Sequence, residues 1–319
     1  MMTKPWQKLT SLPEGVTISG MSAANDSSAL WVCSPAGLFC EKNGLFVQQA
    51  HGIPFQVASA VFAVGKHVLA AGHPASIVHS FDGGNAWFGS RVEQIASVVT
   101  CFAASPDFDR DAVVLAGSDG DGVLRSTDGG NSWQLSNFGL RSLHILALAC
   151  APVWQREPAL GNVTYNYEVV FAATEEGVYL SPNAGRAWQF AGQGLPDAPV
   201  LSLAVSPDFK RTPGLSGPHF DGAVFAGTDG AGLHRSQDGG QNWRALAGFP
   251  AQATVNALLF DSRGRLLAGT GEHGLLASSD LGETWLPLLE TGDVILCLAE
   301  HGNRLLAGVA ENGLLACEA

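Results

Sequence analysis

Carboxylate side chains recur at regular intervals along this chain, and they fall into two sets. The first set stands in a repeated pattern of Ser, any residue, Asp, any residue, Gly, two further residues and Trp. The second set stands in short polar stretches between apolar runs and consists of Asp119, Glu175, Asp229, Glu272 and Glu311. Carboxylates can transfer protons, ligate cations or bind basic groups. Both sets are therefore candidates for chemistry.

Arginine and histidine supply the other candidate groups near the second set, namely Arg91, Arg141, His144 and His273. The sequence contains no HExxH motif, EF-hand loop or CxxC pair, so we predict no dedicated metal site. The glycine-rich strings 117–122 and 227–232 lack the strand-to-helix context and the lysine of a phosphate-binding loop. We therefore expect no cofactor. The six cysteines stand mostly in apolar runs, which is typical of small buried side chains.

Composition excludes several classes of protein. The chain of 319 residues has 17 basic and 29 acidic side chains, for a net charge of −12, which argues against a nucleic-acid partner. With 46% hydrophobic and 14% charged residues the chain is globular, and its 39 glycines suit a turn-rich β protein. No apolar run reaches the length of a signal peptide or of a membrane span, so we expect a cytoplasmic protein without a membrane span.

The first set of carboxylates identifies an internal repeat. Full copies of the pattern are Ser80-Asp82-Gly84-Trp87, Ser126-Asp128-Gly130-Trp133, Ser181-Asn183-Gly185-Trp188, Ser236-Asp238-Gly240-Trp243 and Ser278-Asp280-Gly282-Trp285. A decayed copy, Cys40-Lys42-Gly44-Val47, precedes them. The interval between copies is 40 to 55 residues, which is the length of a four-stranded propeller blade.

Each repeat is predicted to contain four strands, named A to D in chain order, with the repeated pattern between C and D. Runs such as 113–117 and 224–227 are typical of strand B, and 122–126 is typical of strand C. Residues 305–308 and 313–316 match strands B and C of a seventh unit. The chain stops before its strand D, but residues 3–9 resemble one. We therefore predict an all-β, seven-bladed propeller closed by the N-terminal strand.

The predicted propeller is one domain spanning residues 1–319. Its blades are placed near 16–48, 57–91, 98–136, 145–190, 200–246, 255–288, and 294–319 together with 3–9. Closure by the N-terminal strand would leave no unpaired edge at the seam of the ring.

The repeats resemble those of the Asp-box family, also called bacterial neuraminidase repeats, over nearly the whole chain. Proteins with such repeats include sialidases, xyloglucan-degrading glycosidases, sortilin-type receptors and photosystem II assembly factors. The resemblance implies that the repeated turns lie at the periphery of a β-propeller, away from its axis. It indicates architecture, whereas function must be argued from a site.

The repeated pattern is predicted to be structural. Asp can accept hydrogen bonds from backbone N–H groups a few residues on, Gly tolerates a left-handed backbone, and Trp packs against neighbouring strands. The members given this role are Asp82, Trp87, Asp128, Trp133, Asn183, Trp188, Asp238, Trp243, Asp280 and Trp285. We assign no catalytic residue.

The second set of carboxylates is predicted to lie on one face of the propeller, which the B–C turns share with the D–A connections. Asp119, Glu175, Asp229, Glu272, His273 and Glu311 fall in the B–C turns, and Arg91, Arg141 and His144 in the D–A loops. One interpretation is an acidic ring that binds a cation, a sugar or a basic partner. The other is that Asp, Glu and Gly simply suit exposed hairpin turns. The long A–B loops 152–168 and 207–221 are either functional or cover apolar strand ends.

Two functions follow from these features. The first is a non-catalytic binding or assembly scaffold, monomeric by itself, that uses the B–C/D–A face to bind a protein partner or a small polar or cationic ligand. The alternative is a glycoside hydrolase of the sialidase or a related type. A sialidase needs an arginine cluster for its substrate's carboxylate. Arg125 and Arg235, however, immediately precede the repeated serine and have the position of repeat residues.

Overall fold

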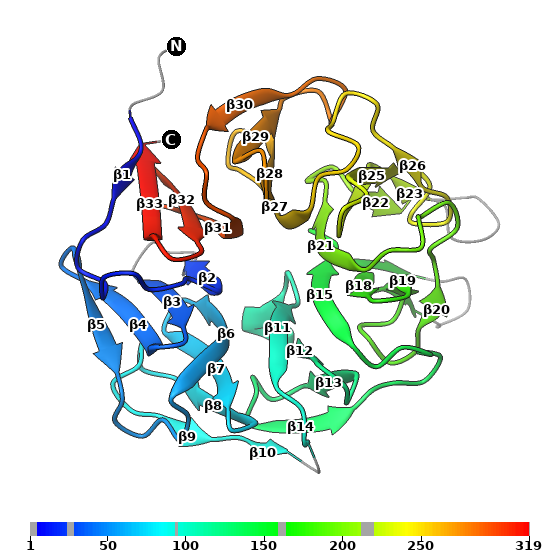
Figure 1. Cartoon of the computed structure of the whole chain (residues 1–319). Helices are drawn as coiled ribbons and strands as arrows, with labels where there is room; N and C mark the ends of the chain where they lie inside the picture. The colour runs from blue at the N-terminus through cyan, green and yellow to red at the C-terminus, as the bar shows by residue number, and fades with distance from the viewer. Residues whose placement is uncertain (1–4, 24–28, 93–94, 159–163, 212–219, 319) are drawn as a thin grey trace.

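Seven β-sheets surround a central axis in the computed structural model, which describes residues 5–23, 29–92, 95–158, 164–211 and 220–318 (Figure 1). Each blade contains antiparallel strands in the order A, B, C, D. The A strands contact one another around the axis, and the D strands form the rim. The prediction of an all-β, seven-bladed propeller is confirmed.

The first four blades contain the following strands. Blade 1 has β2 (Gly20–Ala23), β3 (Leu30–Ser34), β4 (Gly37–Lys42) and β5 (Leu45–Gln49). Blade 2 has β6 (Val57–Val64), β7 (His67–His73), β8 (Ser76–Ser80) and β9 (Phe88–Gly89). Blade 3 has β11 (Val99–Ala104), β12 (Val114–Ser118), β13 (Val123–Ser126) and β14 (Ser132–Leu135). Blade 4 has β15 (Ile145–Cys150), β18 (Val170–Thr174), β19 (Gly177–Ser181) and β20 (Gln189–Phe190).

The last three blades follow the same order. Blade 5 has β21 (Val200–Val205), β24 (Val224–Thr228), β25 (Leu233–Ser236) and β26 (Arg244–Ala245). Blade 6 has β27 (Val255–Phe260), β28 (Leu266–Thr270), β29 (Leu275–Ser278) and β30 (Leu286–Leu289). Blade 7 has β31 (Ile295–His301), β32 (Arg304–Val309), β33 (Gly313–Glu318) and β1 (Gln7–Lys8).

Additional elements lie in the loops. A short helix, α1 (Phe108–Asp111), follows strand A of blade 3. The two long A–B loops contain the strand pairs β16 (Gln155–Pro158) with β17 (Thr164–Tyr167), and β22 (Lys210–Arg211) with β23 (Phe220–Asp221). Residues 159–163 and 212–219 of the predicted loops 152–168 and 207–221 lie outside the described residues. In the described part of the chain, no helix has the length and apolar character needed to cross a membrane.

Neighbouring blades pack closely because strand B carries a glycine where the next blade begins. A Cβ atom on Gly117 of β12 would lie 2.6 Å from Cγ2 of Ile145, the first residue of β15, and 2.7 Å from Sγ of Cys101. The same contact recurs for Gly227 with Val255, Gly269 with Ile295 and Gly308 with Ile18. The recurring glycine therefore allows each blade to sit against the next.

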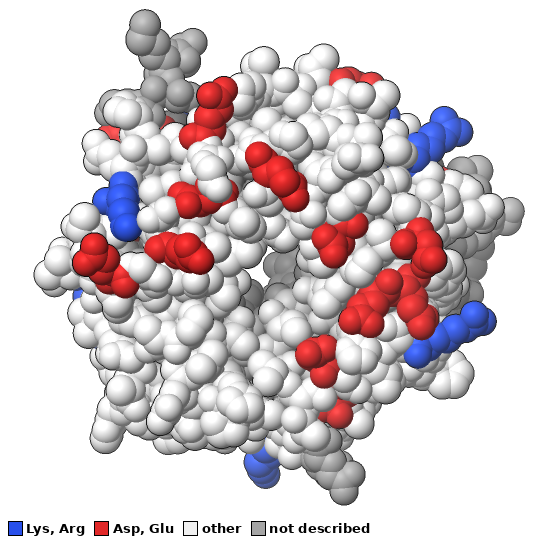
Figure 2. Space-filling model, in the orientation of Figure 1, with Lys and Arg blue, Asp and Glu red and all other residues white. Residues whose placement is uncertain are grey.

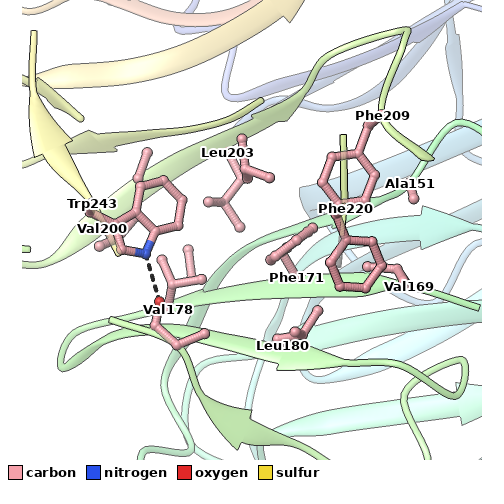
Figure 3. Close-up of a cluster of buried hydrophobic side chains, with 14 residues drawn as sticks. Ala151, Val169, Phe171, Val178, Leu180, Val200, Leu203, Phe209, Phe220 and Trp243 are labelled. Carbon is pink, nitrogen blue, oxygen red and sulfur yellow. Dashed lines mark hydrogen bonds between the residues drawn. The ribbon is translucent and has the colours of Figure 1, made fainter. Parts of the chain in front are cut away.

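The buried core lies between the blades, and Figure 3 shows the part between blades 4 and 5. Trp243 of the repeated pattern is buried there and donates a hydrogen bond from Nε1 to the Ala191 carbonyl at 2.6 Å. Phe209 and Phe220, from the ends of the second long loop, stack with ring centroids 5.2 Å apart and pack on the same cluster. Trp154, from the first long loop, is also buried. The described ends of both loops therefore cover apolar strand ends.

The ring closes where the two ends of the chain meet in blade 7. Strand β1 pairs antiparallel with β33, with Gln7 opposite Ala316 and Lys8 opposite Leu315. Residues 3 and 4 of the predicted closing strand lie outside the described residues. Trp6 donates a hydrogen bond from Nε1 to the Leu288 carbonyl of blade 6 at 3.0 Å, much as Trp243 bonds to blade 4.

An ion pair reinforces the other side of the seam. The Arg304 guanidinium of blade 7 contacts both carboxylate oxygens of Glu41 in blade 1, at 3.1 and 2.7 Å. Both side chains are largely buried, and this two-point geometry is the strongest form of an arginine–carboxylate contact.

Two regions differ from the repeat pattern. Arg91 and Val92 form a short strand, β10, that runs parallel to β14 and gives blade 3 a fifth strand. The decayed copy in blade 1 forms a tight hairpin through Asn43 and Gly44, both with positive φ. A two-residue turn of this kind joins antiparallel strands without the hydrogen bonds of the longer repeated turn.

Candidate binding face

The B–C turns of blades 3 to 7 each place at least one carboxylate on a single face of the ring. We call Asp119, Glu175, Asp229, Glu272 and Glu311 the acidic crescent; all five are exposed. Figure 2 shows carboxylates around much of the central opening, whereas the sector over β6–β9 of blade 2 shows none. The matching turns of blades 1 and 2 contain Pro35-Ala36 and Pro74-Ala75. The crescent is therefore interrupted by an uncharged sector.

Backbone hydrogen bonds hold these turns in place. The N–H of Asp119 donates to the Val98 carbonyl at 2.9 Å, and the N–H of Asp229 donates to the Pro199 carbonyl at 3.0 Å. Equivalent bonds join Gly271 to Thr254 and Ala310 to Val294. The B–C turns of blades 3, 5, 6 and 7 are thus fixed to the D–A connections that precede their blades, which orients their carboxylates before any ligand arrives.

Asp119 and His144 form a pair on this face. Nδ1 of His144 lies 2.8 Å from Oδ1 of Asp119, and a β-bridge joins the backbones of the two residues. The hydrogen bond to Asp119, together with the nearby charge of Glu175, raises the pKa of His144 above its usual value. Both members of the pair remain exposed, so the contact orients them without removing them from solvent.

Asp229 and Glu272 meet at Thr254, in the D–A connection between blades 5 and 6. The Thr254 hydroxyl donates to Oδ1 of Asp229 at 3.2 Å, and its N–H donates to Oε2 of Glu272 at 3.1 Å. No sequence signal marks Thr254, because its contacts arise from the approach of two adjacent blades.

The crescent is bordered by further acidic groups held by hydrogen bonds. Oδ2 of Asp121 accepts from the N–H groups of Ala96 and Ser97 at 2.9 and 2.7 Å. Asp293 accepts from Nδ2 of Asn312 at 2.6 Å, next to Glu311 in the last B–C turn. Asp121 and Asp293 thus fix the loop backbone, and the crescent residues remain the more accessible carboxylates.

The other predicted site residues are not all brought together. Arg141 and His273 are exposed on the loops of this face. Arg91 does not lie with them, because it belongs to β10, the outermost strand of blade 3, where it pairs with Ser132 of β14. Among the described residues, no group of three or more His, Cys, Asp or Glu side chains is placed to hold a metal ion.

The repeated turns form a separate set of hydrogen bonds at the C–D connections. In blade 3, the Ser126 hydroxyl donates to Oδ1 of Asp128 at 2.8 Å and accepts from the Gly130 N–H at 2.8 Å. Asp128 Oδ1 also accepts from the Ser132 N–H at 2.9 Å. Gly130 has φ +87°, and a Cβ atom there would collide with Leu69 of the preceding blade. These contacts give the turn a structural role.

The other repeated turns share this geometry. Asn183 replaces Asp in blade 4, yet its Oδ1 accepts from Ser181 and Ala187 at 2.9 and 3.0 Å. Hydrogen bonds from Thr284 and Ser278 lower the pKa of Asp280 to about 2. The tryptophans of blades 2 to 5 are buried, whereas Trp285 is half-buried. The carboxylates are thus occupied in holding the turns.

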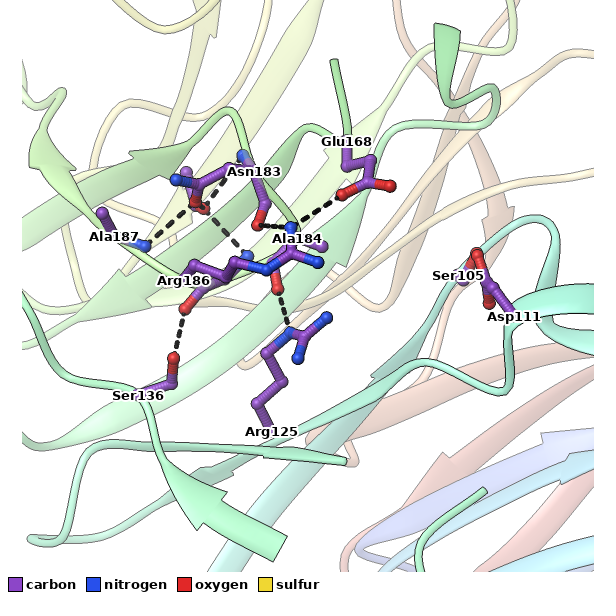
Figure 4. A network of polar contacts seen from close by, with 11 residues as sticks. Ser105, Asp111, Arg125, Ser136, Glu168, Asn183, Ala184, Arg186 and Ala187 are labelled. Carbon is purple, nitrogen blue, oxygen red and sulfur yellow. Dashed lines mark hydrogen bonds and ion pairs between the residues drawn. The ribbon is translucent and has the colours of Figure 1, made fainter. Parts of the chain in front are cut away.

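Two arginines that could have formed a carboxylate-binding cluster are also used between blades, and Figure 4 shows the first of them, Arg125. Nε of Arg125 donates to the Ala184 carbonyl in the repeated turn of blade 4 at 2.8 Å. Arg235 makes the equivalent contact with the Leu281 carbonyl of blade 6 and pairs with Glu283 at 2.8 Å. Each arginine is thus held by the repeated turn of a different blade, blade 4 for Arg125 and blade 6 for Arg235.

Comparisons with known proteins support the fold. No family model matches the chain. A structure of YCF48 bound to D1 peptide is similar, with a TM-score of 0.70, 15% identity, and coverage of 100% of this chain and 98% of that one. The GH74 xyloglucanase from Xanthomonas campestris has a TM-score of 0.68 and 18% identity, over 98% of this chain and 53% of that one. At these identities the likeness shows the fold alone.

One curated protein has a local match in sequence. An oligoxyloglucan-reducing end-specific xyloglucanase of Emericella nidulans (strain FGSC A4) is 40% identical over 70 residues, which is 19% of this chain. The match covers 8% of that enzyme's length.

Proposed function

We propose that this protein is a non-catalytic binding or assembly scaffold whose working surface is the B–C/D–A face. The observation that carries the proposal is the acidic crescent, in which five consecutive blades each present an exposed carboxylate, and backbone hydrogen bonds hold the turns of blades 3, 5, 6 and 7 to the preceding connections. A net charge of −12 favours a basic protein partner or a cationic ligand through long-range attraction.

Two further features support a scaffold. The repeated turns have the residues and hydrogen bonds expected of Asp boxes, and we assign them to that class as structural elements. The structure of YCF48 bound to D1 peptide offers a precedent for peptide binding by a protein of similar fold.

The test is capture of partners from an extract of the organism of origin. The variant carries Asp119→Lys, Asp229→Lys and Glu272→Lys, which reverse three charges of the crescent. A matched control carries Asp109→Lys, Asp208→Lys and Asp221→Lys, three exposed carboxylates in the A–B loops. We expect the wild type and the control to capture the same proteins and the crescent variant to lose them. Capture should also weaken as the salt concentration rises above about 0.1 M, because salt then screens the attraction between exposed charges more than ~10 Å apart.

Undiminished capture by the crescent variant would contradict this assignment of the working surface. The long loops 152–168 and 207–221 would then be the next surface to test.

A glycoside hydrolase is the second candidate, favoured by the local match to the xyloglucanase. It is tested by incubating the purified protein with a panel of xyloglucan oligosaccharides and sialylated glycans and by measuring the release of reducing ends or sialic acid. Turnover that persists through purification would support the enzyme and count against a non-catalytic scaffold. We expect none.

A further inference from the structure

A groove lies in the part of the B–C/D–A face that the acidic crescent leaves uncharged. It has a volume of about 400 Å³ and runs between the B–C turn of blade 1 and the connection from blade 1 to blade 2. Ala36, Gln48, Gln49 and Gln56 line it together with Ile53 and Phe55. No charged side chain is among the described residues that line it.

The lining of this groove has the chemistry that recognises a polypeptide backbone. A glutamine amide offers both a carbonyl acceptor and N–H donors, which match the two groups of a peptide unit. Gln48 donates one N–H to the Ala36 carbonyl at 2.7 Å, and Gln49 donates one to the Val47 carbonyl at 3.2 Å. These bonds orient the two amides. Among the contacts of the described residues, the amide oxygen and the second N–H of each glutamine are left to bind a ligand.

Two apolar side chains, Ile53 and Phe55, also line the groove. Phe55 is buried and packs in the core of blades 1 and 2, and Ile53 is partly buried beside it. An uncharged lining of amides and apolar side chains suits an uncharged segment, because a charged side chain there would lose water without gaining a partner. The position of the groove is equally informative, since blades 1 and 2 fill the gap between the two ends of the crescent.

We propose that the groove binds an extended, uncharged segment of a partner polypeptide whose adjoining Lys- or Arg-containing segment lies over the acidic crescent. This proposal rests on the proposed function and adds the second half of the recognition site. The crescent attracts the basic segment through charge, and the groove selects the neighbouring segment through shape and backbone hydrogen bonds. Charge gives a fast association, and the groove gives specificity.

The experiment pans a phage library of random dodecapeptides against the wild-type protein, an Ala36→Trp variant and an Ala251→Trp control. Ala36 and Ala251 are both exposed on loops of the same face, but Ala251 lies outside the groove. We expect the wild type and the control to enrich peptides in which a basic segment adjoins an uncharged apolar one. Ala36→Trp, with the groove filled, should enrich basic peptides without the apolar segment.

The outcomes separate the two proposals. Enrichment by the wild type of basic peptides that lack an apolar segment would overturn the groove proposal and leave the crescent proposal in place. Enrichment by Ala36→Trp of peptides with the same apolar segment would have the same consequence. No enrichment of basic peptides by the wild type would overturn the proposed basic partner and the groove together.

An affinity measurement completes the test. One enriched peptide, fluorescently labelled, is titrated with each protein and its anisotropy is recorded. We expect Ala36→Trp to raise the Kd by about tenfold or more and Ala251→Trp to raise it by less than about twofold. Equal affinities for the two variants would overturn the proposal, and circular dichroism spectra matching the wild type would show that both variants are folded.

Discussion

Asn183 shows which atom of the repeated turn matters. Its Oδ1 accepts from the Ser181 hydroxyl and the Ala187 N–H, as the Asp Oδ1 does in other blades. The neutral amide is sufficient, so the turn requires an acceptor at this point and not a negative charge. An acceptor that is fully used in folding is a poor candidate for substrate chemistry.

Single substitutions in one turn test this structural role. Trp133→Ala should lower the free energy of unfolding by about 3–5 kcal/mol, because the ring is buried. Asp128→Ala should lower it by about 1–3 kcal/mol, because backbone donors lose their partner. Trp285→Ala, at a half-buried site, should cost less than Trp133→Ala. Urea unfolding followed by circular dichroism measures all three changes relative to the wild type. A variant that keeps wild-type stability but loses partner binding would contradict the structural assignment.

Acid should weaken the same turns. The pKa of Asp280 is lowered to about 2, and the pKa values of Asp82, Asp128 and Asp238 are also lowered. In Asp128 and Asp238, burial opposes the shift, but hydrogen bonds from Ser132 and Asn242 outweigh it.

A group with a lowered folded-state pKa stabilises the fold above its unfolded-state value, about 3.9 for Asp. That contribution is lost as pH falls through the folded-state value. Replacing all four Asp residues by Asn should therefore reduce the fall in Tm between about pH 4 and pH 2. Scanning calorimetry over this range measures the effect, and an unchanged slope would show that other carboxylates dominate acid unfolding.

Among the elements, the contact of strand B with the next blade depends on a missing side chain. Gly117→Ala should destabilise the protein by about 1–3 kcal/mol, since the new Cβ would meet Ile145 and Cys101. Gly89→Ala is the matched control, because nothing lies within 4 Å of its Cβ position. Thermal unfolding compares the two. Adding Cys101→Ala, which removes the Sγ atom that the new Cβ would meet, should recover part of the loss if crowding is the cause, and no recovery would count against crowding.

The elements also show what could be predicted from the sequence. The repeated pattern predicted strands A to D, because it occupies every C–D turn of blades 2 to 6. It did not predict β10, since the two residues Arg91 and Val92 carry no periodicity and gain their partner from blade 3. The site was predicted only as positions on turns. The contacts of His144 and Thr254 join residues 25 apart in sequence, and the groove is built from separate segments.

For the whole molecule, the seam between the first and last blades is the feature on which ring closure depends. Deleting residues 1–10 removes β1 and the hydrogen bond from Trp6 to blade 6. The outer edge of β33 would then be unpaired, and an exposed edge promotes association between chains. We expect a sharp fall in Tm and concentration-dependent aggregation by light scattering. Lys8→Ala, at an exposed position of β1, should leave both unchanged. A truncated protein that melts like the wild type would show that β1 is dispensable.

The meeting of the two ends in blade 7 also orders events in time. Strand β1 is synthesised long before its partner β33, because Gln7 pairs with Ala316. The loop that this pairing closes contains all the other blades, and closing a long loop slows folding. Pro5 and Glu318 line the same small hollow, so a short linker could join them. A circular permutant opened between blades 6 and 7 would convert this most distant pairing into a local hairpin and should complete the ring sooner.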